Sequence, residues 1–238
     1  MHALIVYAHP EPHSFNAALR DVAVATLSEA GYEVEVSDLY AMKFKAVLDR
    51  DDFTTVHNAE RFNASLEQRH AAAHHGLTPD VASELAKLQR TDLLILQFPL
   101  WWFGLPAILK GWIDRVFVSG VVYGRNYLYD HGKLKGKRAL VSTTTGGPAE
   151  LFGPDALNGD MRDILEPLHR GVLGFTGMSV LPPHICHHVP YAGADERAAM
   201  LREYGERLHA LDRLTALPMP KLDDHLAALE ATRKAKAR

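Results

Sequence analysis

The stretch ALIVYAHPEPHSFN, from Ala3 to Asn16, decides the fold of this chain of 238 residues. Its opening ALIVYA is an uninterrupted apolar run, which predicts a short strand buried on both faces. Two prolines and two histidines break the run, and Ser14 then begins a segment whose apolar residues recur at helical spacing as far as Ala30. A buried strand followed at once by a helix predicts the first half of a parallel βαβ unit.

The alternation continues along the chain. Further strands are expected at 33–39, 93–98, 137–145 and within 178–189, with helices at 79–92, 107–119, 161–175 and 194–214 and a long polar loop carrying one Ala-rich helix between 40 and 79. We expect an α/β fold, a flavodoxin-like doubly wound sheet of five parallel strands in the order 2-1-3-4-5. Residues 1–214 are expected to form one domain, and 215–238 a C-terminal tail.

The composition narrows the class of protein. A net charge of -3 and a pI near 6.5 give no electrostatic reason to expect nucleic acid as a partner. Without a membrane-span-length apolar run or a signal peptide ahead of the first strand, we expect a cytoplasmic protein with no membrane insertion. The single cysteine, Cys186, precludes an intrachain disulfide and is expected to be a small buried apolar residue.

Two groups of histidines are candidate metal ligands. His70, His74 and His75 lie in the Ala-rich stretch, and His184 and His188 flank Cys186 along an expected strand. Neither group brings carboxylates or cysteines at a recognised zinc spacing, so the sequence does not predict a metal site.

Three unusual turns should meet at one edge of the sheet. HPEPHSFN follows the first strand, PLWWFG the third and TTTGGP the fourth. Ligands of this fold bind beyond the carboxyl ends of the strands, at the switch point between strands one and three. The three turns therefore predict a ligand site at that edge.

Each turn has a chemical interpretation and a plainer alternative. Ser14 and Asn16 stand where a helix begins and can face an anion, although Ser14 can also be a simple cap. The adjacent rings of Trp101, Trp102 and Phe103 suit a planar ligand or a partner surface, with ordinary packing as the alternative. TTTGGP offers hydroxyls and a close backbone approach, a weak signal by itself. No G-x-G-x-x-G, Walker loop or G-x-S-x-G motif occurs.

These motifs carry a family resemblance. ALIVYAHPEPHSFN, SDLYAMKF, QFPLWWFGLPAILKGWIDRVF, TTGG and GDM together resemble the NAD(P)H:quinone oxidoreductases of the DT-diaphorase type, over nearly all of residues 1–213. The resemblance implies a flavodoxin-like homodimer with FAD at the interface. It also implies that hydride passes from NAD(P)H to flavin N5 and then to a quinone in the same pocket, in ping-pong kinetics.

The resemblance further implies which residues bind FAD. The matching cofactor positions are His9, Ser14, Phe15 and Asn16 for the pyrophosphate and ribityl chain; Pro99, Leu100, Trp101, Trp102 and Phe103 along the ring; Thr144, Thr145, Gly146 and Gly147 at the ring's polar edge; Asn63 from the partner subunit, in place of a glutamine; and Arg197 near the adenine.

The chain departs from the family at the substrate positions. Phe152 and Asn158 stand where mammalian members have a tyrosine and a histidine, so no catalytic proton donor is assigned. Of a pair of substrate-facing tyrosines, Tyr123 matches and Arg125 replaces the other. Arg125 would favour an anionic substrate group, with an ordinary solvated charge as the alternative.

Three functions follow from the sequence. The first is an FAD-dependent NAD(P)H:quinone oxidoreductase with no metal. The alternatives are a regulatory flavoprotein subunit of a membrane transport system and an FMN-dependent azo- or nitroreductase on the same fold.

Overall fold

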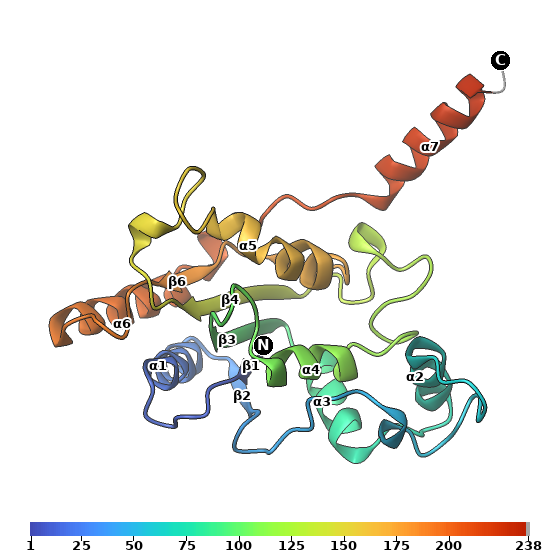
Figure 1. Cartoon of the computed structure of the whole chain (residues 1–238), viewed down its shortest axis with the longest axis horizontal. Helices are drawn as coiled ribbons and strands as arrows, with labels where there is room; N and C mark the ends of the chain where they lie inside the picture. Colours follow the sequence, from blue (N-terminus) through green and yellow to red (C-terminus); the bar gives the residue numbers. More distant parts are fainter. Residues whose placement is uncertain (237–238) are drawn as a thin grey trace.

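The computed structural model describes residues 1–236 and contains a parallel sheet in the order β2-β1-β3-β4-β5, as predicted (Figure 1). The strands are β1 (His2–Tyr7), β2 (Glu33–Asp38), β3 (Leu93–Pro99), β4 (Arg138–Thr144), β5 (Ser179–Val180) and β6 (His184–Cys186). β3 is buried at every position, which explains its uninterrupted apolar sequence. β2 lies at the edge and is only partly buried.

The last strand differs from the single strand expected within 178–189. Two short strands pair with β4 instead, β5 beside Arg138 and Ala139 and β6 beside 142–144. Pro182 and Pro183 lie between them, and a proline has no N–H to donate to a ladder. The predicted order 2-1-3-4-5 is confirmed, and the strand expected last along the chain is divided into β5 and the short β6.

Helices cover both faces of the sheet (Figure 1). On one face, α1 (Phe15–Glu29) packs against α6 (Ala194–His209), and Leu19, Leu27 and Leu208 share a core with β1 and β3. The other face carries α3 (Pro79–Arg90), α4 (Ala107–Val116) and α5 (Met161–Leu168), the last continuing as the π-helix η4 (His169–Gly174). The remaining short helices are η1 (Arg50–Asp52), η2 (Tyr129–His131), η3 (Ala149–Leu151) and η5 (Leu211–Arg213).

The long segment between β2 and α3 contains the expected Ala-rich helix, α2 (Ala64–Ala73). A buried ion pair attaches this segment to α4: Arg115 donates to Asp52 at 2.9 Å. Arg115 also pairs with the more exposed Asp80 of α3 at 2.8 Å. Gly111 permits α4 to lie close to this segment, because a Cβ at this position would overlap the backbone of Ala46. α2 is thereby held at the opposite end of the molecule from α1 (Figure 1).

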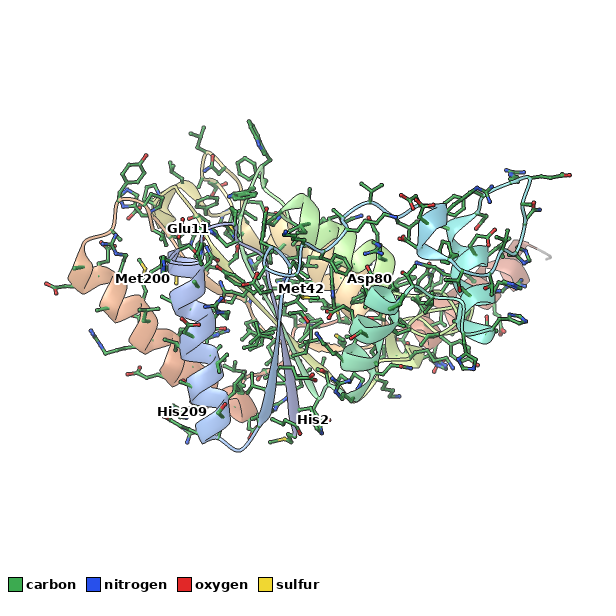
Figure 2. All side chains as sticks on the ribbon, turned by 90° about the horizontal axis from the view of Figure 1, so that it is seen from below. His2, Glu11, Met42, Asp80, Met200 and His209 are labelled. Carbon is green, nitrogen blue, oxygen red and sulfur yellow. The ribbon has the colours of Figure 1, made fainter. Side chains whose placement is uncertain are left out.

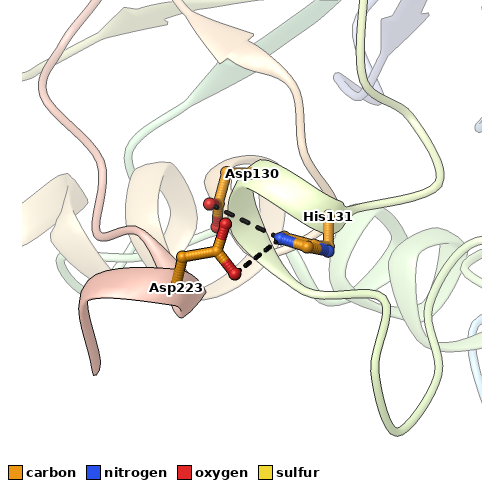
Figure 3. Close-up of side chains that lie close together, drawn as sticks. All are labelled: Asp130, His131 and Asp223. Atoms are coloured by element: carbon orange, nitrogen blue, oxygen red, sulfur yellow. Dashed lines mark hydrogen bonds and ion pairs between the residues drawn. The ribbon is translucent and has the colours of Figure 1, made fainter. Parts of the chain in front are cut away.

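The C-terminal segment leaves the body as an arm (Figure 1). The backbone N–H of Leu217 donates to Val180 at the sheet, and α7 (Leu222–Lys236) then projects outward. Two side chains of η2 hold the base of this helix. Asp130 Oδ1 accepts the Leu222 N–H at 2.6 Å, and His131 Nε2 lies 3.0 Å from Asp223 Oδ1 (Figure 3). A tail was expected here from the sequence, and its helix was not predicted.

Within residues 1–236, none of the helices is long and apolar enough to cross a membrane.

Candidate functional site

The turn after β1 is built around the beginning of α1. Ser14 is the N-cap of the helix, and its Oγ accepts the Ala17 N–H at 3.2 Å. The hydroxyl of the buried Tyr7 lies 3.1 Å from the same Oγ, which supports the cap from inside the sheet. The first N–H groups of a helix have no partner within it, so this end of α1 presents donors and a positive dipole. It can therefore hold a phosphate.

The side chain of Asn16 does not face this anion position. It is buried, with Nδ2 donating to Thr144 Oγ1 at 2.9 Å and Oδ1 accepting from Gln97 Nε2 at 2.9 Å. Asn16 thus connects the first turn to β3 and β4, and only its backbone is available to a ligand. The roles of Gln97 and Tyr7 were not predicted from the sequence; a polar residue within an otherwise apolar strand was the available signal for Gln97.

The aromatic turn after β3 presents its rings outward. Trp101 and Gly104 exchange two backbone hydrogen bonds at 3.1 and 2.9 Å, which closes the turn. Trp102 and Phe103 have φ values of 51° and 57°, a left-handed conformation that is costly for bulky residues. Trp101 is 40%, Trp102 98% and Phe103 52% exposed. A strained turn that exposes three large rings is suited to packing against a planar ligand.

The turn after β4 offers backbone groups at the same edge. The Thr145 N–H donates to Cys186 O at 2.9 Å, and its hydroxyl donates to Gly147 O at 2.8 Å. A Cβ on Gly146 would meet no atom within 4 Å, so the space beside this turn is open. A ring edge can therefore approach the backbone of Thr144–Gly147 closely.

Direct contacts bring the three turns together. Asn16 bonds Thr144, the Leu100 N–H donates to Thr144 O at 2.9 Å, and the ring centroids of His9 and Trp101 are 6.2 Å apart. Burial lowers the pKa of His9, whose Nδ1 accepts the Glu11 N–H, so this imidazole is neutral near pH 7. The expectation that the turns meet at one edge of the sheet is confirmed by these contacts.

Two hollows flank the turns. A hollow of about 420 Å³ extends from the start of α1, and its lining residues are His13, Ser14, Phe15, Ala18, Val189 and Arg197. Val189 was not predicted from the sequence. A more apolar hollow of about 300 Å³ lies beside the aromatic turn, between Phe103 and the α5 residues Ile164 and Leu168.

Three predicted residues lie far from this edge. Asn63 is the N-cap of α2, its side chain accepting the Leu66 N–H at 3.2 Å. Tyr123 lies 3.3 Å from the hydroxyl of Ser65 on that helix, and Arg125 is exposed two residues further on. Because α2 and α1 are at opposite ends of the molecule (Figure 1), one copy of the chain does not bring these residues to the three turns.

Phe152 and Asn158 belong to the loop after the glycines. A Cβ on Gly147 would lie 3.4 Å from the Phe152 ring, which in turn packs against His187 with centroids 5.2 Å apart. The backbone N–H of Asn158 donates to Leu151 O at 2.9 Å. His187 contacts the turn directly, and no role was predicted for it from the sequence.

Cys186 is buried, as expected, and burial raises the pKa of its thiol to about 12. It therefore stays protonated at neutral pH and is a poor nucleophile.

The residues present fit a flavin nucleotide. The three turns supply a helix start for phosphate, exposed rings for an aromatic face and open backbone for a polar ring edge (Figure 2 shows the surroundings of this edge near Glu11). The fold and this edge define a nucleotide-binding α/β protein of the flavin-binding class. The chain belongs to the flavodoxin-like fold family, whose model matches residues 1–208.

Its relatives are quinone-linked dehydrogenases. Ribosyldihydronicotinamide dehydrogenase [quinone] of Mus musculus is 46% identical over 209 residues, covering 87% of this chain and 90% of that protein. NAD(P)H dehydrogenase [quinone] 1 of Cavia porcellus is 42% identical over 207 residues, covering 87% and 75%. These relatives confirm the resemblance to NAD(P)H:quinone oxidoreductases, and membership of that group implies a flavin cofactor.

Solved structures agree. NAD(P)H:quinone oxidoreductase from Methanothermobacter marburgensis has a TM-score of 0.71 and 26% identity, covering 89% of this chain and 97% of that one. A Klebsiella pneumoniae protein assigned as a quinone reductase has a TM-score of 0.88 and 39% identity, covering 93% and 88%.

Proposed function

We propose that this protein is an FAD-dependent NAD(P)H:quinone oxidoreductase of the cytoplasm. Hydride would pass from the nicotinamide to flavin N5 and then to a quinone in the same pocket, so that the two substrates alternate. The observation that carries the proposal is the strained, exposed aromatic turn beside the start of α1, in a chain over 40% identical to quinone-linked dehydrogenases.

The hollow at α1 favours FAD over FMN. FMN ends at its phosphate, which the helix start would hold. The hollow of about 420 Å³ continues past Ser14 to Val189 and Arg197 on the side of α6. That volume suits the second nucleotide of a dinucleotide, with the Arg197 guanidinium available to stack on adenine or to bind a phosphate oxygen.

The proposed ligand contacts follow the turns. The bound flavin would supply the hydride-accepting ring. The first-turn N–H groups of α1 and the polar side chain of His9 would hold phosphate, and the rings of Trp101–Phe103 would orient the ring and exclude water from one face. Backbone N–H groups of Thr144–Gly147 would stabilise negative charge that develops at the polar edge.

The remaining predicted residues require a homodimer. Asn63, Tyr123 and Arg125 lie at the α2 end of the chain and would reach a flavin only on a partner subunit. Phe152 and Asn158 would face the substrate from the subunit that binds the ring. Sedimentation of the flavin-loaded protein tests this arrangement, and a flavin-loaded monomer would contradict it.

The activity is tested with purified protein and a soluble quinone. The absorption spectrum first establishes whether a flavin is bound, and the mass of the extracted cofactor separates FAD from FMN. Rapid mixing with NADPH should bleach the flavin, and quinone should then restore its colour. If NADPH does not bleach the flavin, the regulatory flavoprotein subunit is favoured instead. If the extracted cofactor has the mass of FMN, the azo- or nitroreductase is favoured.

A second hydride donor is suggested by the relatives' names. The Mus musculus protein, and a Homo sapiens protein 44% identical over 216 residues, are ribosyldihydronicotinamide dehydrogenases. Comparing dihydronicotinamide riboside with NADH and NADPH at equal concentrations decides which donor reduces the flavin fastest.

A further inference from the structure

The ionisable side chain of His187 forms a hydrogen bond with the turn after β4. Its Nδ1 lies 3.0 Å from Thr145 Oγ1, and that hydroxyl donates its single proton to Gly147 O at 2.8 Å. Thr145 Oγ1 must then accept, so His187 Nδ1 carries the proton and donates it. A chain of two hydrogen bonds therefore runs from the imidazole to the carbonyl of Gly147.

The backbone around His187 makes this connection rigid. The Cys186 carbonyl accepts the Thr145 N–H at 2.9 Å, the His188 N–H donates to Gly147 O at 2.9 Å, and the Val189 N–H donates to Thr145 O at 3.1 Å. The segment that carries His187 is thus bonded to the turn on both sides of the imidazole. Because these hydrogen bonds hold the turn in place, a positive charge on His187 would change the electrostatic potential at the turn without displacing its backbone.

The imidazole ring of His187 also packs on Phe152, which stands where the resemblance implies a tyrosine in other members. The two ring centroids are 5.2 Å apart with an interplanar angle of 34°. Phe152 has no proton to exchange, whereas the imidazole beneath it does. The ionisable group at this edge of the site is therefore His187, which follows β6, and not a tyrosine at the position of Phe152 in the loop.

A hollow of about 330 Å³ gives His187 access to solvent protons. The titratable groups that line it, from η3, the β6 segment and α6, are Glu150, His184, Cys186, His188, Glu196 and Glu203. Burial lowers the pKa of His187, and the nearby Glu150 carboxylate opposes that effect. The imidazole is consequently neutral near pH 7, and an added negative charge at the turn would favour its protonation.

We propose that His187 is a positioning residue for the flavin ring, which takes up a proton when the ring is reduced and transmits the charge to the turn through Thr145. The inference deepens the proposed function and rests on it. Hydride uptake brings two electrons and one proton to the ring and adds one negative charge there. One proton taken from water by His187 balances that charge, which leaves the imidazolium donating to Thr145.

The test is the number of protons taken up per two electrons. The midpoint potential of the flavin-loaded protein is measured between pH 5 and 9 for the wild type, His187→Asn and His187→Phe. Asparagine places an amide N–H near the position of Nδ1, so it keeps the donor to Thr145 without titrating. Phenylalanine keeps the packing on Phe152 and removes the donor. Near neutral pH, both variants should take up one proton fewer than the wild type.

Flavin affinity distinguishes the hydrogen bond that His187 donates to Thr145 from the proton that His187 takes up. His187→Asn should bind flavin within about twofold of the wild type, whereas His187→Phe should bind up to about tenfold more weakly, the value of one hydrogen bond. His188→Asn is the matched control: it removes the neighbouring imidazole, and asparagine tolerates the φ of 59° at this position. Its proton count should equal that of the wild type.

The outcomes are distinguishable from those of the proposed function. Equal proton counts in wild type and His187→Asn, with normal quinone reduction, overturn the role of His187 alone. A protein that binds no flavin overturns both proposals. Histidine NMR signals provide an independent measurement: the pKa of His187 should rise on reduction of the bound flavin, and that rise should be smaller in Thr145→Val.

Discussion

Asn16 Nδ2 donates a hydrogen bond of 2.9 Å to Thr144 Oγ1, joining two turns that are 128 residues apart in the chain. The same amide accepts from Gln97. Asn16→Ala leaves Gln97 and Thr144 unpaired in a buried position and should lower the free energy of unfolding by about 2–3 kcal/mol. It should also weaken flavin binding, because the turns lose their common connection. Urea unfolding and flavin titration measure both effects.

Gln89→Ala is the control for this variant, since it removes a side-chain amide from an exposed position on α3. Its unfolding free energy should stay within about 0.5 kcal/mol of the wild type. If Asn16→Ala were equally mild, the Asn16 network would not hold the turns together.

Trp102→Ala should separate stability from binding. The side chain is 98% exposed, so its removal should change the free energy of unfolding by less than about 0.5 kcal/mol. Flavin affinity should nevertheless fall about tenfold through lost ring packing. Trp102→Phe keeps an aromatic ring and should recover most of the affinity. Equal flavin affinity in Trp102→Ala and wild type would remove this ring from the site.

Phe152→Tyr should change turnover and leave cofactor affinity unaltered. The ring position is already set by His187 and Gly147, and the added hydroxyl introduces a proton donor near the polar edge. One hydrogen bond formed only during the reaction corresponds to a rate increase of up to about tenfold. Steady-state kinetics with a soluble quinone and flavin titration make the comparison. A change in flavin affinity without a change in turnover would contradict it.

Acid should destabilise the protein over a defined pH range. Burial lowers the pKa of both His169 and His184 to about 4, from an ordinary value of 6.5. Above pH 6.5 both are neutral whether the chain is folded or not. As the pH falls from 6.5 towards 4, only the unfolded chain takes up their protons, so stability is lost, by roughly 3 kcal/mol at most for each histidine.

Urea unfolding at several pH values checks this loss. His169→Gln should reduce the slope of the unfolding free energy against pH even if it lowers stability at pH 7, because the unfolded chain then takes up one proton fewer. Gln89→Ala, which removes a non-titrating side chain from an exposed position, should leave the slope unchanged. An identical slope in His169→Gln would show that His169 does not titrate in this way.

Asp130→Ala should loosen α7 without affecting the rest of the protein. Asp130 accepts the N–H of Leu222 at the first turn of that helix, a charge-assisted bond at the positive end of the dipole. Hydrogen exchange in 222–236 should speed up severalfold, while the melting temperature stays unchanged. Asp224→Ala, also in the first turn of α7, serves as the comparison. Protection that persists in Asp130→Ala would mean that other contacts hold the arm.

Local sequence was sufficient for the strand order and for the ligand edge. The apolar runs at Ala3–Ala8 and Leu93–Phe98 are continuous because both faces of the sheet are covered, and that pattern is visible without coordinates. Parallel strands place their carboxyl ends at one edge, so the three unusual turns had to meet. The adjacent rings of Trp101–Phe103 were expected to suit a planar ligand or a partner surface, and their exposure agrees with that interpretation.

Tertiary structure alone decided which polar groups face inward. Asn16 looked like a ligand contact, but β3 and β4 supply Gln97 and Thr144 as its partners, and no local pattern encodes a contact across 81 or 128 residues. His187 looked like one of several histidines until β6 placed it on Thr145. The helix of the C-terminal arm likewise begins where the Leu222 N–H donates to Asp130, 92 residues earlier in the chain. Hydrogen-bond partners distant in sequence are chosen by packing, whereas periodicity reports only burial.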